Sequence, residues 1–455
     1  MAIDLTKDLF KSIIGWIEDG NIDEAIKVIV ELHPADIADL IESLDKEAVA
    51  SIFDYFNDEL SAEVLSELDE DVRIRLMDAF SPKQVYYRFL KGMDSDDGAD
   101  LINELPDDQR KSVTEYLRTE IKSDAADLIS LLKYDEDTAG GLMAKELVRV
   151  NINWTVKECI DEIRRVADEV ESVYAVYVVD DKGELLGLVP LSKLIISKST
   201  AAINEFYDPK VISVNDTDSA QNVADIMEKY DFVAMPVVDF MNRLVGRVTI
   251  DDVVDFIREE AEEDYQLASG LSENVEYSDT VWVLSRARLP WLFLGLLGGV
   301  ASSKVIGLYE ADIKIYPEMA LFIPLIAAMG GNAGVQSSAI VVQSLASNNI
   351  MESGLWAKLG KELKVSLING VLCGIALLIY GLIAEDSLSL SFTISTALLT
   401  VVVIAAVLGA FIPMFLNSLK IDPALATGPF ITTTNDLLGL GIYFFIGRMM
   451  YGIAF

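Results

Sequence analysis

A single carboxylate lies inside an apolar stretch, GPFITTTNDLLGLGIYFFIG (428–447), where eleven uncharged residues follow Asp436. A carboxylate within a membrane costs roughly 2.5–3.5 kcal/mol on insertion scales, and such residues usually face a protein interior or a water-filled path. We expect Gly428-Pro429 to interrupt the helix and to free backbone carbonyls. Further oxygen comes from Thr432, Thr433, Thr434 and Asn435. Oxygen without nitrogen or sulfur suits a hard cation, so the pattern predicts a cation site. The alternative is a carboxylate that caps or bonds a neighbouring helix.

A second polar segment, PLIAAMGGNAGVQSSAIVVQS (324–344), lies in an earlier apolar stretch. Its glycines, Gly330, Gly331 and Gly334, allow helices to approach closely. Its neutral polar side chains are those of Asn332, Gln336, Ser337 and Ser338. Two interpretations stay open: helix packing with interhelical hydrogen bonds, or a polar lining for an ion path.

The formal net charge of −37 is distributed unevenly along the 455 residues. From Ser285 onward the chain has nine acidic and nine basic residues, so the whole excess lies before Ser285. An acidic soluble part repels phosphate backbones and anionic headgroups, which argues against nucleic-acid binding and favours metal cations as partners. Most acidic surfaces, however, are only solvated.

Residues for other chemistries are scarce. The two cysteines, Cys159 and Cys373, indicate neither a disulfide framework nor a thiolate cluster. The single histidine, His33, precedes a proline at an expected helix start and is interpreted as a structural or surface residue, since zinc or copper needs more nitrogen or sulfur ligands. The sequence shows no nucleophile and base pair, phosphate loop or redox motif, so we expect no enzyme.

Five apolar segments are each long enough to cross a bilayer. They span residues 289–309, 319–346, 365–384, 389–416 and 425–447. Arg286 and Arg288, the lysines at 358, 361 and 364, and Lys420 fall in loops on one side, whereas Glu310, Asp312, Glu318, Glu385 and Asp386 fall in loops on the other. The positive-inside rule and the missing signal peptide predict a cytoplasmic N-terminus and an external C-terminus. Lys304 and Arg448 are discordant.

The acidic part contains two kinds of repeat. Amphipathic helical segments of about 24 residues begin at His33, Asn57, Ser81 and Pro106, each with a capping residue or proline, which predicts an α-solenoid-like domain. Farther on, residues 174–195 align with 232–254, so that Val178-Val179-Asp180 and Gly187 match Val237-Val238-Asp239 and Gly246. This second repeat predicts helix, strand, turn, strand and helix, and resembles a tandem pair of cystathionine-β-synthase-type (CBS) domains.

The whole chain resembles the MgtE family of magnesium channels. The resemblance rests on DEDTAGGLMA (135–144), GGNAGVQSS, DPALATGPFITTTNDLLGL and the order of the domains. It implies a multidomain membrane protein, a homodimer, with these parts: an acidic α-helical solenoid-like N-domain (1–133), two α/β CBS domains (134–198 and 199–260), a connecting plug helix (261–284) and a five-helix transmembrane domain (285–455).

The resemblance also implies a function. The second and fifth spans of both subunits would line a pore in the inner or plasma membrane of a prokaryote, with Asp436 from each subunit binding one hydrated Mg²⁺. Thr432 and Asn332 are further candidate ligands. Gly428 stands where some relatives have Asn, which removes side-chain help at that position.

In the family, intracellular Mg²⁺ bridges the N-domain, the CBS domains and the plug helix and holds the pore closed. Carried over to this sequence, the resemblance implies these ligands: Glu63, Asp96, Asp100, Asp218, Asp231, Asp252, Asp255, Glu260, Glu263, Asp264 and Asp422. The segment after Asp218 reads SAQNV and lacks a glutamate expected there, so one ligand is missing. For each of these residues a solvated helix face is an equally open interpretation.

The sequence therefore predicts a Mg²⁺-selective uptake channel that closes when internal magnesium suffices, with an adenosine nucleotide as a possible ligand of the CBS pair. One alternative is a transporter of Co²⁺ or Mn²⁺. Another is a membrane-anchored metal or nucleotide sensor without transport, against which the intramembrane Asp436 argues.

Overall fold

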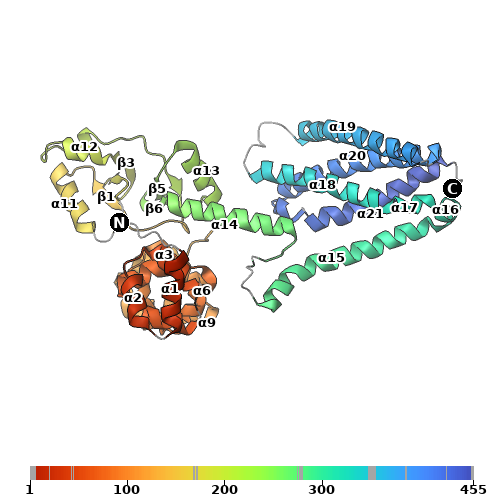
Figure 1. The fold of residues 1–455 in the computed structure, drawn as a ribbon. Helices are drawn as coiled ribbons and strands as arrows, with labels where there is room; N and C mark the ends of the chain where they lie inside the picture. Colours follow the sequence, from red (N-terminus) through yellow and green to blue (C-terminus); the bar gives the residue numbers. More distant parts are fainter. Residues whose placement is uncertain are drawn as a thin grey trace. The chain divides into compact units, whose positions relative to one another are not determined.

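The computed structural model describes residues 7–19, 21–42, 44, 46–167, 170, 173–273, 275, 280–346, 355–384, 387–426 and 428–451. The chain forms two compact units, residues 1–257 and 258–455 (Figure 1). The first contains a helical domain and two small sheets, and the second is a bundle of long helices.

The helical domain repeats as predicted. Its elements are α1 (Lys7–Glu18), α2 (Ile22–Ile29), α3 (Pro34–Glu42), α4 (Lys46–Phe53), α5 (Asp58–Ser66), α6 (Glu70–Met77), α7 (Pro82–Val85), η1 (Tyr86–Leu90), α8 (Ser95–Glu104), α9 (Asp107–Tyr116), η2 (Leu117–Ile121), η3 (Lys122–Ala125) and α10 (Ala126–Leu131). The helix pairs begin at residues 34, 58, 82 and 107. Side chains at three of the starts satisfy exposed backbone N–H groups: Asn57 accepts from Leu60 N, Ser81 forms a capping box, and His33 Nδ1 accepts from Ala35 N. His33 thus has a structural role.

The two sheets confirm the second repeat. Their elements are β1 (Val148–Asn151), α11 (Val156–Val166), β2 (Val176–Val179), β3 (Leu185–Val189) and α12 (Leu191–Ile196), then η4 (Ile203–Glu205), β4 (Val214–Asn215), α13 (Ala220–Tyr230), β5 (Ala234–Val238) and β6 (Leu244–Thr249). Each sheet has one parallel and one antiparallel pair. Val178 pairs with Gly187 and Val237 with Gly246, and each ladder shifts register at the next residue. Strands β1 and β4 were not predicted.

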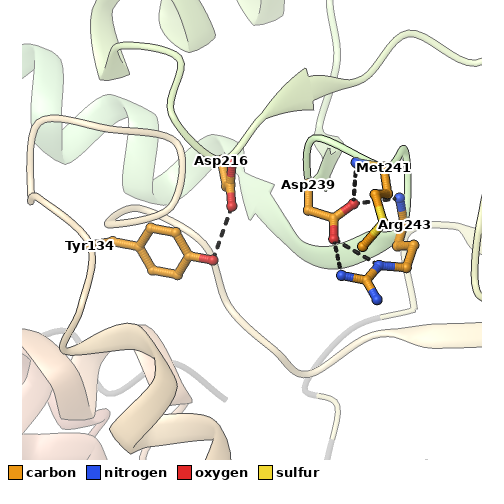
Figure 2. Close-up of polar contacts among 5 residues, drawn as sticks. All are labelled: Tyr134, Asp216, Asp239, Met241 and Arg243. Carbon is orange, nitrogen blue, oxygen red and sulfur yellow. Dashed lines mark hydrogen bonds and ion pairs between the residues drawn. The ribbon is translucent and has the colours of Figure 1, made fainter.

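An aspartate stabilises the matching hairpin turn in each of the two copies. Asp239 Oδ1 accepts hydrogen bonds from the backbone N–H groups of Met241 and Arg243, both 2.9 Å long, and its Oδ2 binds the Arg243 guanidinium (Figure 2). Asp180 accepts from the two equivalent backbone N–H groups, of Lys182 and Glu184. These aspartates therefore close the hairpin turns.

The DEDTAGGLMA segment joins the edge of the second sheet. Ala139 N donates to Asp218 O (2.7 Å) and Gly140 N to Asp216 O (2.9 Å). Tyr134 Oη donates to Asp216 Oδ2 at 3.1 Å (Figure 2). A Cβ on Gly140 would collide with the Tyr134 ring, so a glycine is needed there. The segment thus lies against the second copy although it precedes the first.

Helix α14 (Ile250–Ser269) leads to the second unit, whose elements are α15 (Val281–Leu308), α16 (Glu310–Ile315), α17 (Glu318–Leu321), α18 (Ile323–Ala346), α19 (Leu355–Ile383), α20 (Leu388–Ser418), η5 (Pro423–Ala426) and α21 (Gly428–Met450). Five helices of the described chain, α15, α18, α19, α20 and α21, are long and apolar enough to span a membrane, which confirms the predicted number. The connecting helix differs from the prediction, since α14 begins at Ile250 and Gly270, at φ +82°, ends it. Residues 274 and 276–279 of the predicted plug helix lie outside the described residues.

Small residues set the spacing of the bundle. α20 packs against α18, α19 and α21, and α15 packs against α21 (Figure 1). A Cβ on Gly409 of α20 would collide with the Gly334 carbonyl of α18, and one on Gly334 would collide with the Asn435 side chain of α21. The backbones of α18, α20 and α21 therefore approach as closely as glycine permits.

Candidate metal sites

Asp436 lines a pocket of the second unit. The pocket has a volume of about 740 Å³ and lies between the end of α14, one face of α15 and the first turns of α21. Arg288 and Trp291 line it from α15, and Thr432, Thr433 and Asp436 line it from α21. The Asp436 side chain is half-buried. The intramembrane carboxylate therefore opens onto a space large enough for a hydrated ion.

The α18 glycine motif lies beside the same carboxylate. A methyl group built on Gly331 would lie 3.9 Å from Asp436 Oδ1 and 3.4 Å from Thr432 Cγ2. Asn332, the neighbouring candidate ligand, is exposed on α18. The structure thus brings Asp436 and Thr432 together beside Gly331, whereas it records no contact of Asn332 with Asp436 among the residues described.

The structure places Gly428-Pro429 at the start of a helix, after η5, rather than at a break inside one. Helix α21 begins at Gly428, and Pro429 is its second residue. The first helical turn tolerates proline because its N–H groups have no partner within the helix. The Gly428 carbonyl is not freed, since it accepts a 3.0 Å hydrogen bond from Thr432 Oγ1. The Thr432 hydroxyl therefore turns toward its own helix.

The other polar groups of α18 contribute to packing. Ser337 Oγ donates a 2.6 Å hydrogen bond to Glu362 Oε1 of α19, and Ser338 is fully buried. Asn435, which is 2% exposed, packs against Gly334. Helix packing thus accounts for Gly334, Ser337 and Asn435, whereas Thr432, Thr433 and Asp436 of α21 line the pocket.

The first unit gathers carboxylates from α8 and α14. Burial, with the nearby carboxylates of Asp252, Asp97 and Asp94, raises the pKa of Asp96 well above its usual range. Burial also raises the pKa of Asp252 to about 6, with further contributions from Asp251 and Asp97. Buried acids that repel one another favour either a proton or a cation, so the cluster suits a metal ion.

Two members of this cluster have additional properties. Asp252 Oδ2 accepts hydrogen bonds from Thr249 N (3.1 Å) and Thr249 Oγ1 (2.6 Å) at the start of α14, so one of its oxygens caps the helix. Asp100 is solvent-exposed, yet its crowded surroundings and the carboxylates of Asp97 and Glu136 raise its pKa to about 7.

No group of three or more His, Cys, Asp or Glu side chains in the described ranges is close enough to hold a bare metal ion. A hydrated Mg²⁺ would not require such a group, because it keeps several waters and is bound through one or two carboxylates. Asp97 and Asp251 belong to the cluster but were not predicted. Their signal lay in the runs DDGAD and DDVVD, in which successive acids project at different angles from a helix.

Four predicted sensor residues of the first unit lie outside this cluster. Asp218 Oδ2 accepts from Asn215 N (2.8 Å) and closes a turn. Asp231 ends α13 in the left-handed conformation, at φ 55°. Glu63 and Asp255 are exposed on α5 and α14. The structure therefore assigns local structural roles to the first two and a solvated face to the others.

The second unit has its own pair of acids where α14 meets α21. Burial and the nearby Asp422 raise the pKa of Asp264. Asp422 Oδ1 also accepts a 2.7 Å hydrogen bond from Ala424 N. Glu260 and Glu263 lie exposed on the same helix.

Glycines allow α14 and α21 to approach each other closely at this point. A Cβ on Gly428 would collide with the Ala268 carbonyl, and one on Gly270 would lie 2.6 Å from Pro429 Cγ. The end of α14 thus touches the first residues of the helix that carries Asp436.

Five membrane-capable helices around an intramembrane carboxylate, joined to an acidic helical domain and a CBS pair, define a multi-pass membrane transporter of divalent cations. Family models agree: residues 323–446 match the MgtE model, described as a divalent cation transporter, residues 32–137 match the MgtE intracellular N domain, and residues 139–197 and 203–259 match the CBS domain. The chain belongs to the MgtE family of magnesium transporters.

Individual relatives span nearly the whole chain. It is 30% identical over 445 residues to the magnesium transporter MgtE of Bacillus subtilis (strain 168), which covers 98% of each chain. It is 36% identical over 326 residues to magnesium transporter MgtE of Enterococcus faecalis (strain ATCC 700802 / V583), covering 72% of each. The crystal structure of the soluble part of a magnesium transporter is 29% identical, with a TM-score of 0.50, and covers 56% of this chain and 99% of that one.

Proposed function

We propose that the protein is a Mg²⁺-selective channel for magnesium uptake and that Asp436 binds the passing ion. The observation that carries this proposal is the Asp436 carboxylate in a pocket that Thr433 also lines, within a membrane part whose acidic and basic residues balance. Mg²⁺ gives up its water reluctantly, so a wide site can select it by bonding its hydration shell. In a homodimer two Asp436 carboxylates balance one dication. Asn332 would then contribute from its exposed position on α18.

We propose a cytoplasmic N-terminus and an external C-terminus in a prokaryotic inner or plasma membrane. The basic residues in the first turns of α15, in the first turns of α19 and just after α20 support this orientation. Arg448, discordant by sequence, forms an ion pair with Asp312 at 2.7 Å and so adds no net charge at its end. Of the acidic loop residues, Glu385 and Asp386 lie outside the described residues.

We propose that intracellular Mg²⁺ closes the channel by neutralising the acids of both units. In the first unit the α8 and α14 carboxylates repel one another until a cation or proton arrives. In the second unit Asp264 and Asp422 oppose the contact of α14 with the start of α21. A cation at these acids would strengthen that contact. The exposed carboxylates of Glu63, Asp255, Glu260 and Glu263 remain proposed sensor ligands, and so do Asp218 and Asp231, although each of these two also has a local structural role. We also propose that the chain divides into an N-domain (1–133), two CBS domains (134–198 and 199–260), a plug segment (261–284) and a transmembrane domain (285–455).

We propose that the CBS pair binds an adenosine nucleotide. Arg247 is 5% exposed, and its guanidinium lies 5.5 Å from the ring centroid of Tyr174. An aromatic ring can stack on a base and a guanidinium can bind a phosphate. We propose these two residues as the first to test by substitution in a nucleotide-binding measurement.

Reconstitution tests the ion path. Asp436→Asn in proteoliposomes is expected to abolish Mg²⁺ influx, because the neutral amide no longer balances the dication. Glu362→Gln is the matched control, since it makes the same chemical change in a membrane helix at a carboxylate that bonds Ser337, and it should retain influx. Unchanged flux in Asp436→Asn would sink the assignment. A preference for Co²⁺ or Mn²⁺ would favour a different cargo, and an absence of flux from wild-type protein would favour a sensor.

Proteolysis tests the gating. Millimolar Mg²⁺ is expected to protect residues 260–285 in the full-length protein, because neutralised acids hold α14 in place. Asp264→Asn should flatten the dependence of protection on Mg²⁺, while Glu310→Gln, at an exposed acid of the same unit, should leave it unchanged. Equal protection with and without the ion would remove support for the gating proposal.

A further inference from the structure

A buried ion pair joins the last turns of α21 to α16. Arg448 Nε and Nη2 lie 2.9 and 2.7 Å from Asp312 Oδ2. The Asp312 side chain is 6% exposed and that of Arg448 is 23% exposed. Buried charges are stable only when paired, since an unpaired one loses its solvation without compensation.

Aromatic contacts surround the pair. The Arg448 guanidinium lies 4.9 Å from the Tyr309 ring centroid, and Tyr309 stacks on Phe444 with the centroids 5.0 Å apart. Tyr443, fully buried, donates from Oη to the Met319 carbonyl at 2.8 Å. The segment 309–319 therefore holds α21 by hydrogen bonds, ring contacts and charge together.

Arg448 follows Asp436 by twelve residues, which corresponds to about 18 Å along a helix. That distance exceeds the screening length of about 8 Å at physiological ionic strength, so Arg448 acts little on an ion already bound at Asp436. It acts on an ion that approaches this end of the helix. In the proposed orientation this end faces outside, where Mg²⁺ enters.

We propose that Asp312 is a positioning residue for cation entry: it holds the outer end of the Asp436 helix and neutralises Arg448, which would otherwise repel incoming Mg²⁺. This inference rests on the proposed function for its direction of transport. The ion pair itself is independent of that function.

The test measures Mg²⁺ influx into proteoliposomes as a function of external Mg²⁺. Asp312→Asn is expected to raise the half-saturating concentration about fivefold at low ionic strength, and the increase should shrink as salt is added. Adding Arg448→Gln to Asp312→Asn should return the half-saturating concentration to within about twofold of wild type, since the unpaired charge is gone. Glu310→Gln breaks the exposed Glu310–Lys314 pair of the same helix α16. This control variant should leave the half-saturating Mg²⁺ concentration unchanged at both low and high salt.

A purely structural role gives a different result. Asp312→Asn would then lower the amount of folded protein or the maximal flux while the half-saturating concentration stays unchanged, and the entry role would be overturned. Thermal unfolding in detergent of both single variants and the double variant separately measures how much the Asp312–Arg448 ion pair stabilises the protein. If the two single variants lose stability non-additively, the ion pair stabilises the protein; additive losses would refute this role. If wild type carries no Mg²⁺, the proposed function and the entry role both fail, while the unfolding cycle still decides whether the ion pair stabilises the protein.

Discussion

Gly331 of α18 lies against the Asp436 carboxylate of α21, with Asp436 Oδ1 3.9 Å from the position of a Cβ on Gly331. Because a glycine has no side chain there, no side-chain atom of residue 331 lies against the carboxylate, and a Cβ would make ordinary contacts with Asp436 Oδ1 and Thr432 Cγ2. The size of residue 331 should therefore affect ion passage more than stability.

Gly331→Ala is expected to lower Mg²⁺ influx about fivefold, since losing one hydrogen bond to the hydration shell is worth about 1 kcal/mol. Unfolding in detergent should change little, because the added methyl makes only ordinary contacts. Gly360→Ala on α19, where a Cβ has no neighbour within 4 Å, is the control for both measurements. Wild-type influx in Gly331→Ala would contradict the ion path.

Gly428→Ala should weaken closing by internal Mg²⁺. Residue 428 has φ +46°, and its Cβ would collide with the Ala268 carbonyl. The left-handed conformation alone costs about 1–2 kcal/mol for a non-glycine residue, or about tenfold in an equilibrium. The Mg²⁺ concentration that half-inhibits flux should therefore rise about tenfold. Gly441→Ala, on the same helix and without neighbours within 4 Å, should leave it unchanged; an equal rise there would point to a general effect on α21.

Gly409→Ala is expected to destabilise the membrane bundle. Its Cβ would collide with the Gly334 carbonyl, and backbone cannot move aside as a flexible side chain can. Overpacking of this kind costs about 1–3 kcal/mol, which should appear as a lower unfolding temperature in detergent. Gly307→Ala, in open space at the end of α15, provides the comparison. A stable Gly409→Ala variant would show that α18 and α20 can separate without loss.

The acid cluster predicts a pH dependence of the first unit. The folded pKa of Asp252, about 6, is higher than its ordinary value of 3.8, so the folded state binds more protons between these values. Stability should therefore fall as pH rises from about 4 to 6, and the cost, at most about 3 kcal/mol, persists above pH 6.

Calorimetry of the full chain from pH 4 to 8 measures this dependence. Asp252→Asn should remove its share of the slope while an amide still caps α14, and Asp255→Asn, at an exposed position on the same helix, should not. Millimolar Mg²⁺ should stabilise wild type at pH 7.5 and lose that effect near pH 5, where protons compete. A slope that Asp252→Asn leaves intact would contradict the role of this acid.

Local sequence patterns predicted most elements of the fold. The helix starts after His33, Asn57 and Ser81 were readable because a cap and its helix are neighbours in sequence. The matching of Val178 with Gly187 and of Val237 with Gly246 followed from strand periodicity and a short turn. Five spans followed from length and hydropathy.

The candidate sites were predicted only in part. Asp436 was evident because a carboxylate in an apolar helix is costly. The carboxylates of Asp97 and Asp251 were missed, since their roles depend on two helices more than a hundred residues apart in the chain. The helix start at Gly428 was also missed, because it is set together with the contact to Ala268.

The sequence by itself thus determined the elements, their repeats, the membrane part and the intramembrane carboxylate, since each depends on residues close together along the chain. Only the tertiary structure decided which groups meet. The Arg448 that looked misplaced by its charge is paired with Asp312, 136 residues earlier, and Gly331 lies beside Asp436. Such contacts arise from packing between distant segments, and neither periodicity nor composition records them.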